Sequence, residues 1–185
     1  MINVNDLRPG MTFEYENNTY VVVDANHSKS GRGQAHVKAK VKNLRTKSNT
    51  IITFTGGEKV KKAMVEKSKM QYLYSDGTDA FFMNNETYEQ ITIPVKELTW
   101  EFNFLTEGLN VQVTSFKEEV LGLVLPDKIT LEIIEAEAAV KGDTTSGAQK
   151  KAILETNFEV VVPLFIEVGE KVIVSTIDGK YSGRA

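Results

Sequence analysis

The feature that most constrains the fold of this chain is a period of two in its apolar residues, repeated over many short runs. These runs are rich in β-branched and aromatic residues and end at turn residues such as Glu16-Asn17-Asn18, Gly56-Gly57 and Ser75-Asp76-Gly77. The expected strands are residues 11–15, 20–24, 37–44, 50–55, 70–74, 80–83, 88–93, 111–116, 120–125, 130–135, 158–162 and 171–176. The pattern predicts an all-β protein.

One segment, residues 95–107, departs from this pattern. Its apolar residues at helical spacing are Val95, Leu98, Phe102 and Leu105. This spacing predicts one short amphipathic helix. Trp100 and Phe104 widen its apolar face, and we expect these rings to belong to the core rather than to a binding platform, because small β domains need such bulk.

The 185 residues are enough for one large domain or for two to three small ones. Pro126-Asp127 separates two expected strands and indicates a domain boundary nearby. We expect three serial modules, 1–64, 65–128 and 129–185. Each has about 60 residues, close to the lower limit for independent folding.

Charge is distributed unevenly along the chain. Residues 25–57 contain seven basic residues and no acidic one, although the whole chain has a formal net charge of -3. The net charge is +6 for residues 1–64, -6 for 65–129 and -3 for 130–185. This asymmetry favours contact between the first third and a polyanion. The alternative is that these basic residues merely form the solvated face of a strand.

The basic stretch has two parts. Residues 29–34 lie between two expected strands and read as the tip of a β-hairpin, where Gly31 and Gly33 would hold Arg32 out on a stalk. Lys38, Lys40 and Lys42 then alternate with apolar residues, which predicts one lysine-bearing strand face.

The remaining composition argues against an enzyme. The chain has no cysteine, which excludes disulfides, thiolate metal sites and a cysteine nucleophile. His27 and His36, the only histidines, lack a sequence-local carboxylate, and the Gly-Arg-Gly segment lacks the rest of a phosphate-binding loop. We therefore expect no catalytic residue, no metal and no cofactor. The N-terminus does not resemble a secretory signal, and no run approaches the roughly 20 apolar residues of a membrane helix, so we expect a cytoplasmic protein.

From end to end, the sequence resembles the bacterial translation elongation factor P family. The matching segments are KSGRGQA at 29–35, KNL at 42–44, MQYLY at 70–74, KGDT at 141–144, VPLFI at 162–166, GE at 169–170 and STIDGKY at 175–181. The closing run is the most specific of these. The resemblance implies an SH3-like, KOW-type first domain followed by two OB-fold barrels, in an L-shaped molecule.

The resemblance also implies a function. The family binds the ribosome beside peptidyl-tRNA and relieves stalling at consecutive prolines, and its first-domain loop reaches the tRNA acceptor end. Arg32 matches the contact residue of that loop. The supporting loop positions are Lys29, Ser30, Gly31, Gly33 and Gln34, and the basic residues expected to face RNA are Lys38, Lys40, Lys42 and Arg45.

Further positions follow from the same resemblance. Gly142, Asp143 and Thr144 match a third-domain loop that approaches the small subunit and the codon. Tyr181 and Arg184 match C-terminal positions associated with RNA contact, although packing is an equal alternative for Tyr181. The implied partners are both ribosomal subunits and peptidyl-tRNA, with no membrane, and we expect a monomer.

Two residues depart from the common family pattern. Arg32 stands where many relatives carry a lysine that is extended on its amine. Arginine has no such amine, so we expect either rhamnosylation by a glycosyltransferase or an unmodified side chain. Ser30 replaces a frequent proline, which should make the tip less rigid. The alternatives are a non-ribosomal RNA-binding or transcription-associated module, and a small enzyme with a histidine beside a carboxylate.

Overall fold

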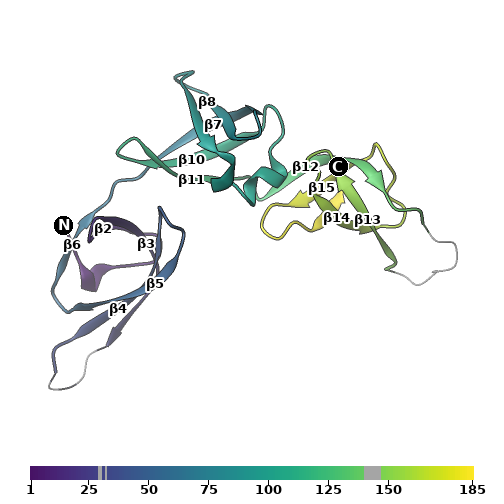
Figure 1. Cartoon of the computed structure of the whole chain (residues 1–185). Coiled ribbons are helices and arrows are strands. Elements are labelled where there is room, and N and C mark those ends of the chain that lie inside the picture. Colours follow the sequence, from purple (N-terminus) through teal and green to yellow (C-terminus); the bar gives the residue numbers. More distant parts are fainter. Residues whose placement is uncertain (29–30, 32, 140–146) are drawn as a thin grey trace. The chain divides into compact units, whose positions relative to one another are not determined.

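The computed structural model describes residues 1–28, 31, 33–139 and 147–185, which form three antiparallel β-sheets (Figure 1). The chain packs into two compact units. The first contains Met1–Lys67 and Val113–Gly122, and the second contains Ser68–Gln112 and Leu123–Ala185. Within the described ranges, no helix has the length and apolar character needed to span a membrane.

The first sheet has the strand order β1-β6-β2-β3-β4-β5. Its elements are β1 (Ile2–Asn3), the 3-10 helix η1 (Val4–Asp6), β2 (Thr12–Tyr15), β3 (Asn18–Ser28), β4 (His36–Asn43), β5 (Asn49–Thr55) and β6 (Lys59–Lys62). Burial along β4 alternates strictly, with Val37, Ala39 and Val41 inside. Phe13 and Phe54 fill the interior with an edge-to-face ring contact at 6.0 Å. The sheet thus buries one face and exposes the other.

The second sheet has the order β11-β10-β7-β8-β9. Its strands are β7 (Glu66–Ser75), β8 (Asp79–Asn84), β9 (Gln90–Pro94), β10 (Asn110–Phe116) and β11 (Glu119–Val124). Two residues, Lys117 and Glu118, connect β10 to β11 with φ values of 48° and 66°. Two successive left-handed residues are typical of a tight hairpin turn. The outer part of this hairpin belongs to the first unit.

The prediction of one α-helix over residues 95–107 is wrong. The segment instead forms two 3-10 helices, η2 (Val95–Glu97) and η3 (Glu101–Phe104). Leu98 leaves helical geometry at φ -115° and ψ 35°, and its N–H bonds back three residues to the Val95 carbonyl at 2.9 Å. Thr99 and Trp100 follow, and β-branched and aromatic side chains lose rotamer freedom in an α-helix. The apolar periodicity identified the buried Leu98 and Leu105, but Val95 and Phe102 are only half-buried and the segment forms 3-10 rather than α-helical turns.

The third sheet has the order β14-β13-β12-β15-β16. Its strands are β12 (Lys128–Ala136), β13 (Gln149–Leu154), β14 (Glu159–Pro163), β15 (Lys171–Ser175) and β16 (Tyr181–Arg184). Four strands of the three sheets were not predicted: β1, β6, β13 and β16. Each is very short or rich in polar residues, such as KVKK in β6, so its apolar signal is weak.

An aromatic cluster lies beside the third sheet. The Phe104 ring is fully buried in the core of that sheet and lies 5.1 Å from the rings of both Trp100 and Phe158. Trp100 remains 39% exposed at the edge, and its indole Nε1 donates a hydrogen bond to the Thr176 carbonyl at 2.8 Å. The core prediction is therefore right for Phe104 and only partly right for Trp100. Because Trp100 and Phe104 follow β9, this cluster joins the middle segment to the third sheet within the second unit.

Gly179 completes this cluster, and we predict that Gly179→Ala destabilises the second unit. Its φ is +72°, and an added Cβ would lie 2.7 Å from Phe158 Cζ and 3.2 Å from the Trp100 ring. Gly169→Ala is the matched control, because φ is +89° there and no atom would lie within 4 Å of the added Cβ. Backbone strain alone should cost about 1–2 kcal/mol, and overpacking should add roughly 1–3 kcal/mol for Gly179→Ala only. Urea unfolding measures both, and equal midpoints would contradict the prediction.

Candidate nucleic-acid interface

A row of lysines occupies the outer face of β4. Lys38, Lys40 and Lys42 are all exposed and alternate with the buried apolar residues, as the pattern predicted. On the adjacent strands, Asn26 pairs with Lys38 and Asp24 pairs with Lys40. Asp24 lies just outside the acid-free stretch, so its proximity to Lys40 was not foreseen from the sequence. The register therefore sets one carboxylate among three exposed ammonium groups.

The β3–β4 pair is long, and its inner face stays in the core as far as Val37, which pairs with His27. Pairing continues from Tyr20↔Asn43 at one end to Ser28↔His36 at the other. Eight residue steps of extended strand span about 26 Å. Beyond that end, Gly31, Gly33 and Gln34 are exposed. Lys29, Ser30 and Arg32, which were expected at the tip, lie outside the described residues.

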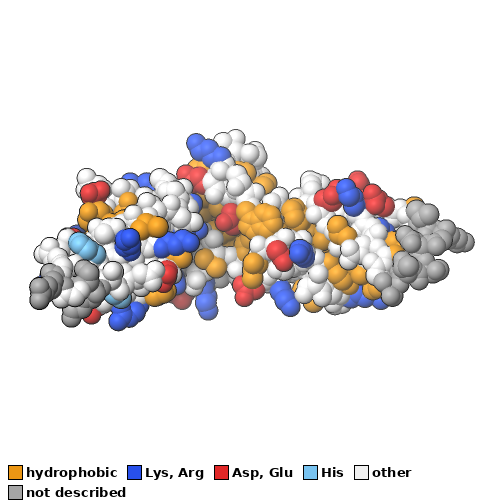
Figure 2. All heavy atoms as spheres, turned by 90° about the horizontal axis from the view of Figure 1, so that it is seen from below, with side chains coloured by type: hydrophobic (Ala, Val, Ile, Leu, Met, Phe, Trp, Pro, Cys, Tyr) orange, Lys and Arg blue, Asp and Glu red, His pale blue; other side chains and the backbone are white. Residues whose placement is uncertain are grey.

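Both histidines lie near this outer end and are exposed. Figure 2 shows histidine side chains, in pale blue, at the molecular surface. In the part of the chain that the structure describes, every ion pair is made by lysine or arginine, so neither histidine is paired with a carboxylate there. The described residues also contain no group of three or more His, Asp or Glu side chains that could hold a metal ion.

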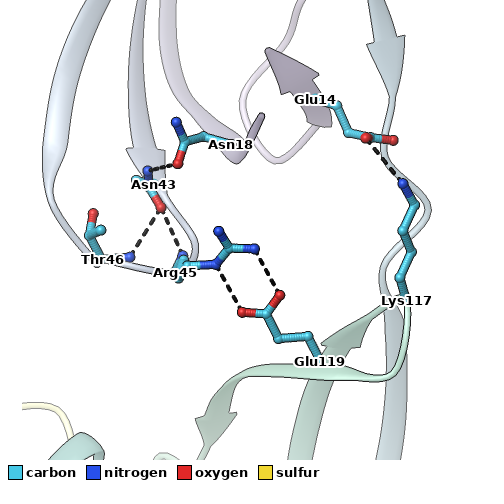
Figure 3. Close-up of polar contacts among 7 residues, drawn as sticks. All are labelled: Glu14, Asn18, Asn43, Arg45, Thr46, Lys117 and Glu119. Atoms are coloured by element: carbon cyan, nitrogen blue, oxygen red, sulfur yellow. Dashed lines mark hydrogen bonds and ion pairs between the residues drawn. The ribbon is translucent and has the colours of Figure 1, made fainter. Parts of the chain in front are cut away.

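Arg45 has a specific partner that the sequence did not indicate. It follows the end of β4 and forms a two-point contact with Glu119 in the β10–β11 hairpin (Figure 3). Arg45 Nε lies 2.9 Å from Glu119 Oε1, and Nη2 lies 2.8 Å from Oε2. Hydrogen bonding to Arg45, with a smaller coulombic contribution, lowers the pKa of Glu119 below its ordinary value. The basic residue expected to face RNA with the lysine row is thus held by a carboxylate.

The buried side chain of Asn43 shapes the turn that presents Arg45. Its Oδ1 accepts hydrogen bonds from the backbone N–H groups of Arg45 at 2.9 Å and Thr46 at 3.1 Å (Figure 3). Its Nδ2 donates to Asn18 Oδ1 at 3.2 Å. Asparagine commonly closes a turn in this way, and Asn43-Leu44-Arg45-Thr46 directly after a strand carried that signal.

A second cluster of charged residues lies on the same unit. Glu14 on β2 forms ion pairs with Lys61 on β6 and with Lys117 in the hairpin, each with a nitrogen–oxygen distance of 3.3 Å. Partial desolvation raises the pKa of Glu14, but hydrogen bonds and attraction from the two lysines outweigh it, so the pKa lies below its ordinary value. Two charged residues of the hairpin, Lys117 and Glu119, are therefore paired with the first barrel.

The C-terminal candidates differ in their surroundings. Tyr181 is half-buried and packs against the core of the third sheet. Arg184 is exposed, pairs with Glu170, and lies over the Phe165 ring at 5.1 Å from its centroid. Gly142, Asp143 and Thr144 lie outside the described residues. Sequence reasoning missed Phe165, although it is part of the VPLFI segment.

The described structure is a series of small antiparallel β modules, the first of which carries a cationic strand face. Three family models match successive parts of the chain. Residues 3–60 match the elongation factor P KOW-like domain, residues 65–123 the elongation factor P OB domain, and residues 129–184 the elongation factor P C-terminal domain.

Full-length relatives agree with these matches. The chain is 62% identical over 184 residues to elongation factor P of Mesoplasma florum and 60% identical over 184 residues to that of Mycoplasma mycoides subsp. mycoides. In both comparisons 100% of each chain is covered. The protein belongs to the elongation factor P family.

Solved structures share the fold over about two thirds of the chain. A translation initiation factor 5A from Methanococcus jannaschii matches with a TM-score of 0.57 and 21% identity, covering 67% of this chain and 91% of that one. A translation initiation factor 5A family protein from Naegleria fowleri matches with a TM-score of 0.51 and 15% identity, covering 67% and 96%. The predicted all-β fold, a KOW-type domain followed by OB-fold domains, is confirmed.

Proposed function

We propose that this protein binds the ribosome beside peptidyl-tRNA and promotes peptide-bond formation at consecutive prolines. Membership of the elongation factor P family supports a role in translation elongation. The observation that carries the finer proposal is the exposed lysine row on β4, beyond whose first residue, His36, Gly31 and Gly33 are also exposed. Such a surface suits contact with tRNA phosphates.

The proposed mechanism is positioning without acid–base chemistry by the protein. Proline reacts slowly in peptide transfer, and a factor that holds the acceptor end in reactive geometry lowers the barrier. Each ~1.4 kcal/mol removed is worth about tenfold in rate, and orientation supplies several such steps. In this proposal Arg32 contacts the acceptor end. The residues that support it are Lys29, Ser30, Gly31, Gly33 and Gln34.

The other modules are assigned by the same family role. The functional modules are 1–64, 65–128 and 129–185, which lie close to the three family matches. Gly142, Asp143 and Thr144 approach the small subunit and the codon, and Arg184, with its exposed guanidinium over Phe165, offers a flat surface to RNA. The protein acts as a monomer in the cytoplasm, where ribosomes are found.

Arg32→Ala tests the central contact. Reconstituted translation of a message with a proline run is measured with and without the full-length protein. The wild type should accelerate synthesis, and Arg32→Ala should lose at least about tenfold of this acceleration because the positioning guanidinium is gone. Arg8→Ala, an exposed arginine of the same unit whose guanidinium bonds only to nearby carbonyls in the described structure, is the control and should retain activity. Unchanged rescue by Arg32→Ala would refute the role of the loop and leave the family assignment intact.

The modification of Arg32 has a direct measurement. Because arginine lacks a nucleophilic amine, extension of the type made on lysine is not expected, and Arg32 is either rhamnosylated by a glycosyltransferase or works unmodified. If Arg32 is rhamnosylated, the intact mass of protein purified from its native host exceeds that of the sequence by one deoxyhexose, with the extra mass on the peptide containing Arg32. A mass equal to that of the sequence excludes glycosylation.

Removal of charge from the lysine row should weaken tRNA binding in a salt-dependent way. For Lys38→Gln, Lys40→Gln and Lys42→Gln, the slope of log affinity against log salt should fall by roughly 0.7 to 0.9 for each lost phosphate contact. Lys171→Gln, an exposed lysine on β15, is the matched control. Binding of peptidyl-tRNA-loaded ribosomes across a salt series measures the slope. A slope equal to that of the control would remove the lysine row from the interface.

A further inference from the structure

A clamp of five charged residues fastens the β10–β11 hairpin to the first barrel. Its members are Glu14, Arg45, Lys61, Lys117 and Glu119. All five lie in the first unit, in which the hairpin tip packs with the barrel. Glu14 forms ion pairs with Lys61 and Lys117, and Glu119 forms an ion pair with Arg45. The hairpin thus contributes a positive charge, Lys117, to one group and a negative charge, Glu119, to the other.

The geometry of these pairs is directional. The Arg45 guanidinium presents two parallel N–H groups to the Glu119 carboxylate, and this fork fixes the relative angle of the two side chains. The side chains of Arg45 and Glu119 are 58% and 47% exposed, so solvent screens the pair and its value lies in orientation more than in stability.

The hairpin turns tightly where it meets the barrel. Lys117 and Glu118 both have positive φ, although the left-handed region disfavours side chains other than glycine and asparagine. The turn places Lys117 Nζ 3.3 Å from Glu14 Oε2. The tight turn thus brings a hairpin side chain within reach of a β2 carboxylate.

The clamp also lies beside one end of the β3–β4 strand pair, which we call the finger. Asn43, which shapes the Arg45 turn, pairs with Tyr20 at one end of the β3–β4 ladder, whereas His36 and Ser28 pair at the other. If the barrel rotated by about 5° about the clamp, the far end of the β3–β4 pair, about 26 Å away, would move by about 2 Å. Displacements of about 1 Å can cost a hundredfold in reactions that depend on orientation.

We infer that Glu119 and Glu14 are positioning residues: by clamping the hairpin to the first barrel, they set where the β3–β4 finger presents its tip to the tRNA. This role rests on the proposed function. It reassigns Arg45 from direct RNA contact to the clamp. The clamped part of the hairpin belongs to the same unit as the β3–β4 pair.

The test uses the full-length protein in proline-run translation. Glu14→Gln with Glu119→Gln removes both carboxylate charges and keeps side-chain size. The maximal acceleration at saturating protein should fall about two- to fivefold, the range to which coupling energies of exposed ion pairs convert. The half-saturating concentration should change less. The pair-reversed variant Arg45→Glu with Glu119→Arg should recover activity, which a general loss of stability would not allow. Glu159→Gln, from the exposed Lys151–Glu159 pair of the third sheet, is the matched control.

A second readout is independent of the ribosome. Because the chain has no cysteine, Lys59→Cys and Ser115→Cys give two unique sites for spin labels, on β6 and β10 of the first unit. The distance distribution between the labels should broaden in the Glu14→Gln/Glu119→Gln background and narrow again with the reversed pair. The proposed clamp would be overturned if the wild type accelerates synthesis and the Glu14→Gln/Glu119→Gln variant does so equally well. An unchanged distance distribution in that variant would overturn it too. Absence of acceleration by the wild type would instead refute the proposed function.

Discussion

The structure depends on the burial of one face of each small sheet. A module of about 60 residues has little interior, so each strand must send every second side chain inward. In β4 this requirement buries Val37, Ala39 and Val41 and leaves the opposite positions free for other uses. The lysine row occupies those positions. The cationic face is thus a direct consequence of how the core is formed, and a one-residue slip in register would reverse both.

The all-β fold and most strands could be predicted from the sequence because alternation and turn residues are local signals. Strands that were missed, such as KVKK in β6, are held by pairing with neighbours rather than by their own apolar pattern. The helix predicted over residues 95–107 shows the opposite error. Its apolar spacing was that of a helix, but Leu98 leaves helical geometry. The Phe104 ring packs in the core of the third sheet, which the local sequence does not indicate.

The candidate site was predictable only in part, for a similar reason. The exposure of Lys38, Lys40 and Lys42 followed from periodicity. The partner of Arg45 did not, because Glu119 lies 74 positions away in the chain. Asp24 beside Lys40 depends on the strand register and on a bulge between Val22 and Asp24. Charge counts along a sequence therefore describe local excess, whereas the charges that meet in space are set by pairing.

The first compact unit is discontinuous, and this has a consequence for dissecting the protein. Its hairpin portion, Val113–Gly122, is encoded far from Met1–Lys67. A fragment that stops at the end of the amino-terminal module would lack that portion, and Glu14 and Arg45 would lose their hairpin partners to water. An isolated amino-terminal fragment is therefore a poor substitute for the intact molecule, even where its barrel folds. The residues that form its hydrophobic core are continuous in the chain, whereas the compact unit also needs the distant hairpin.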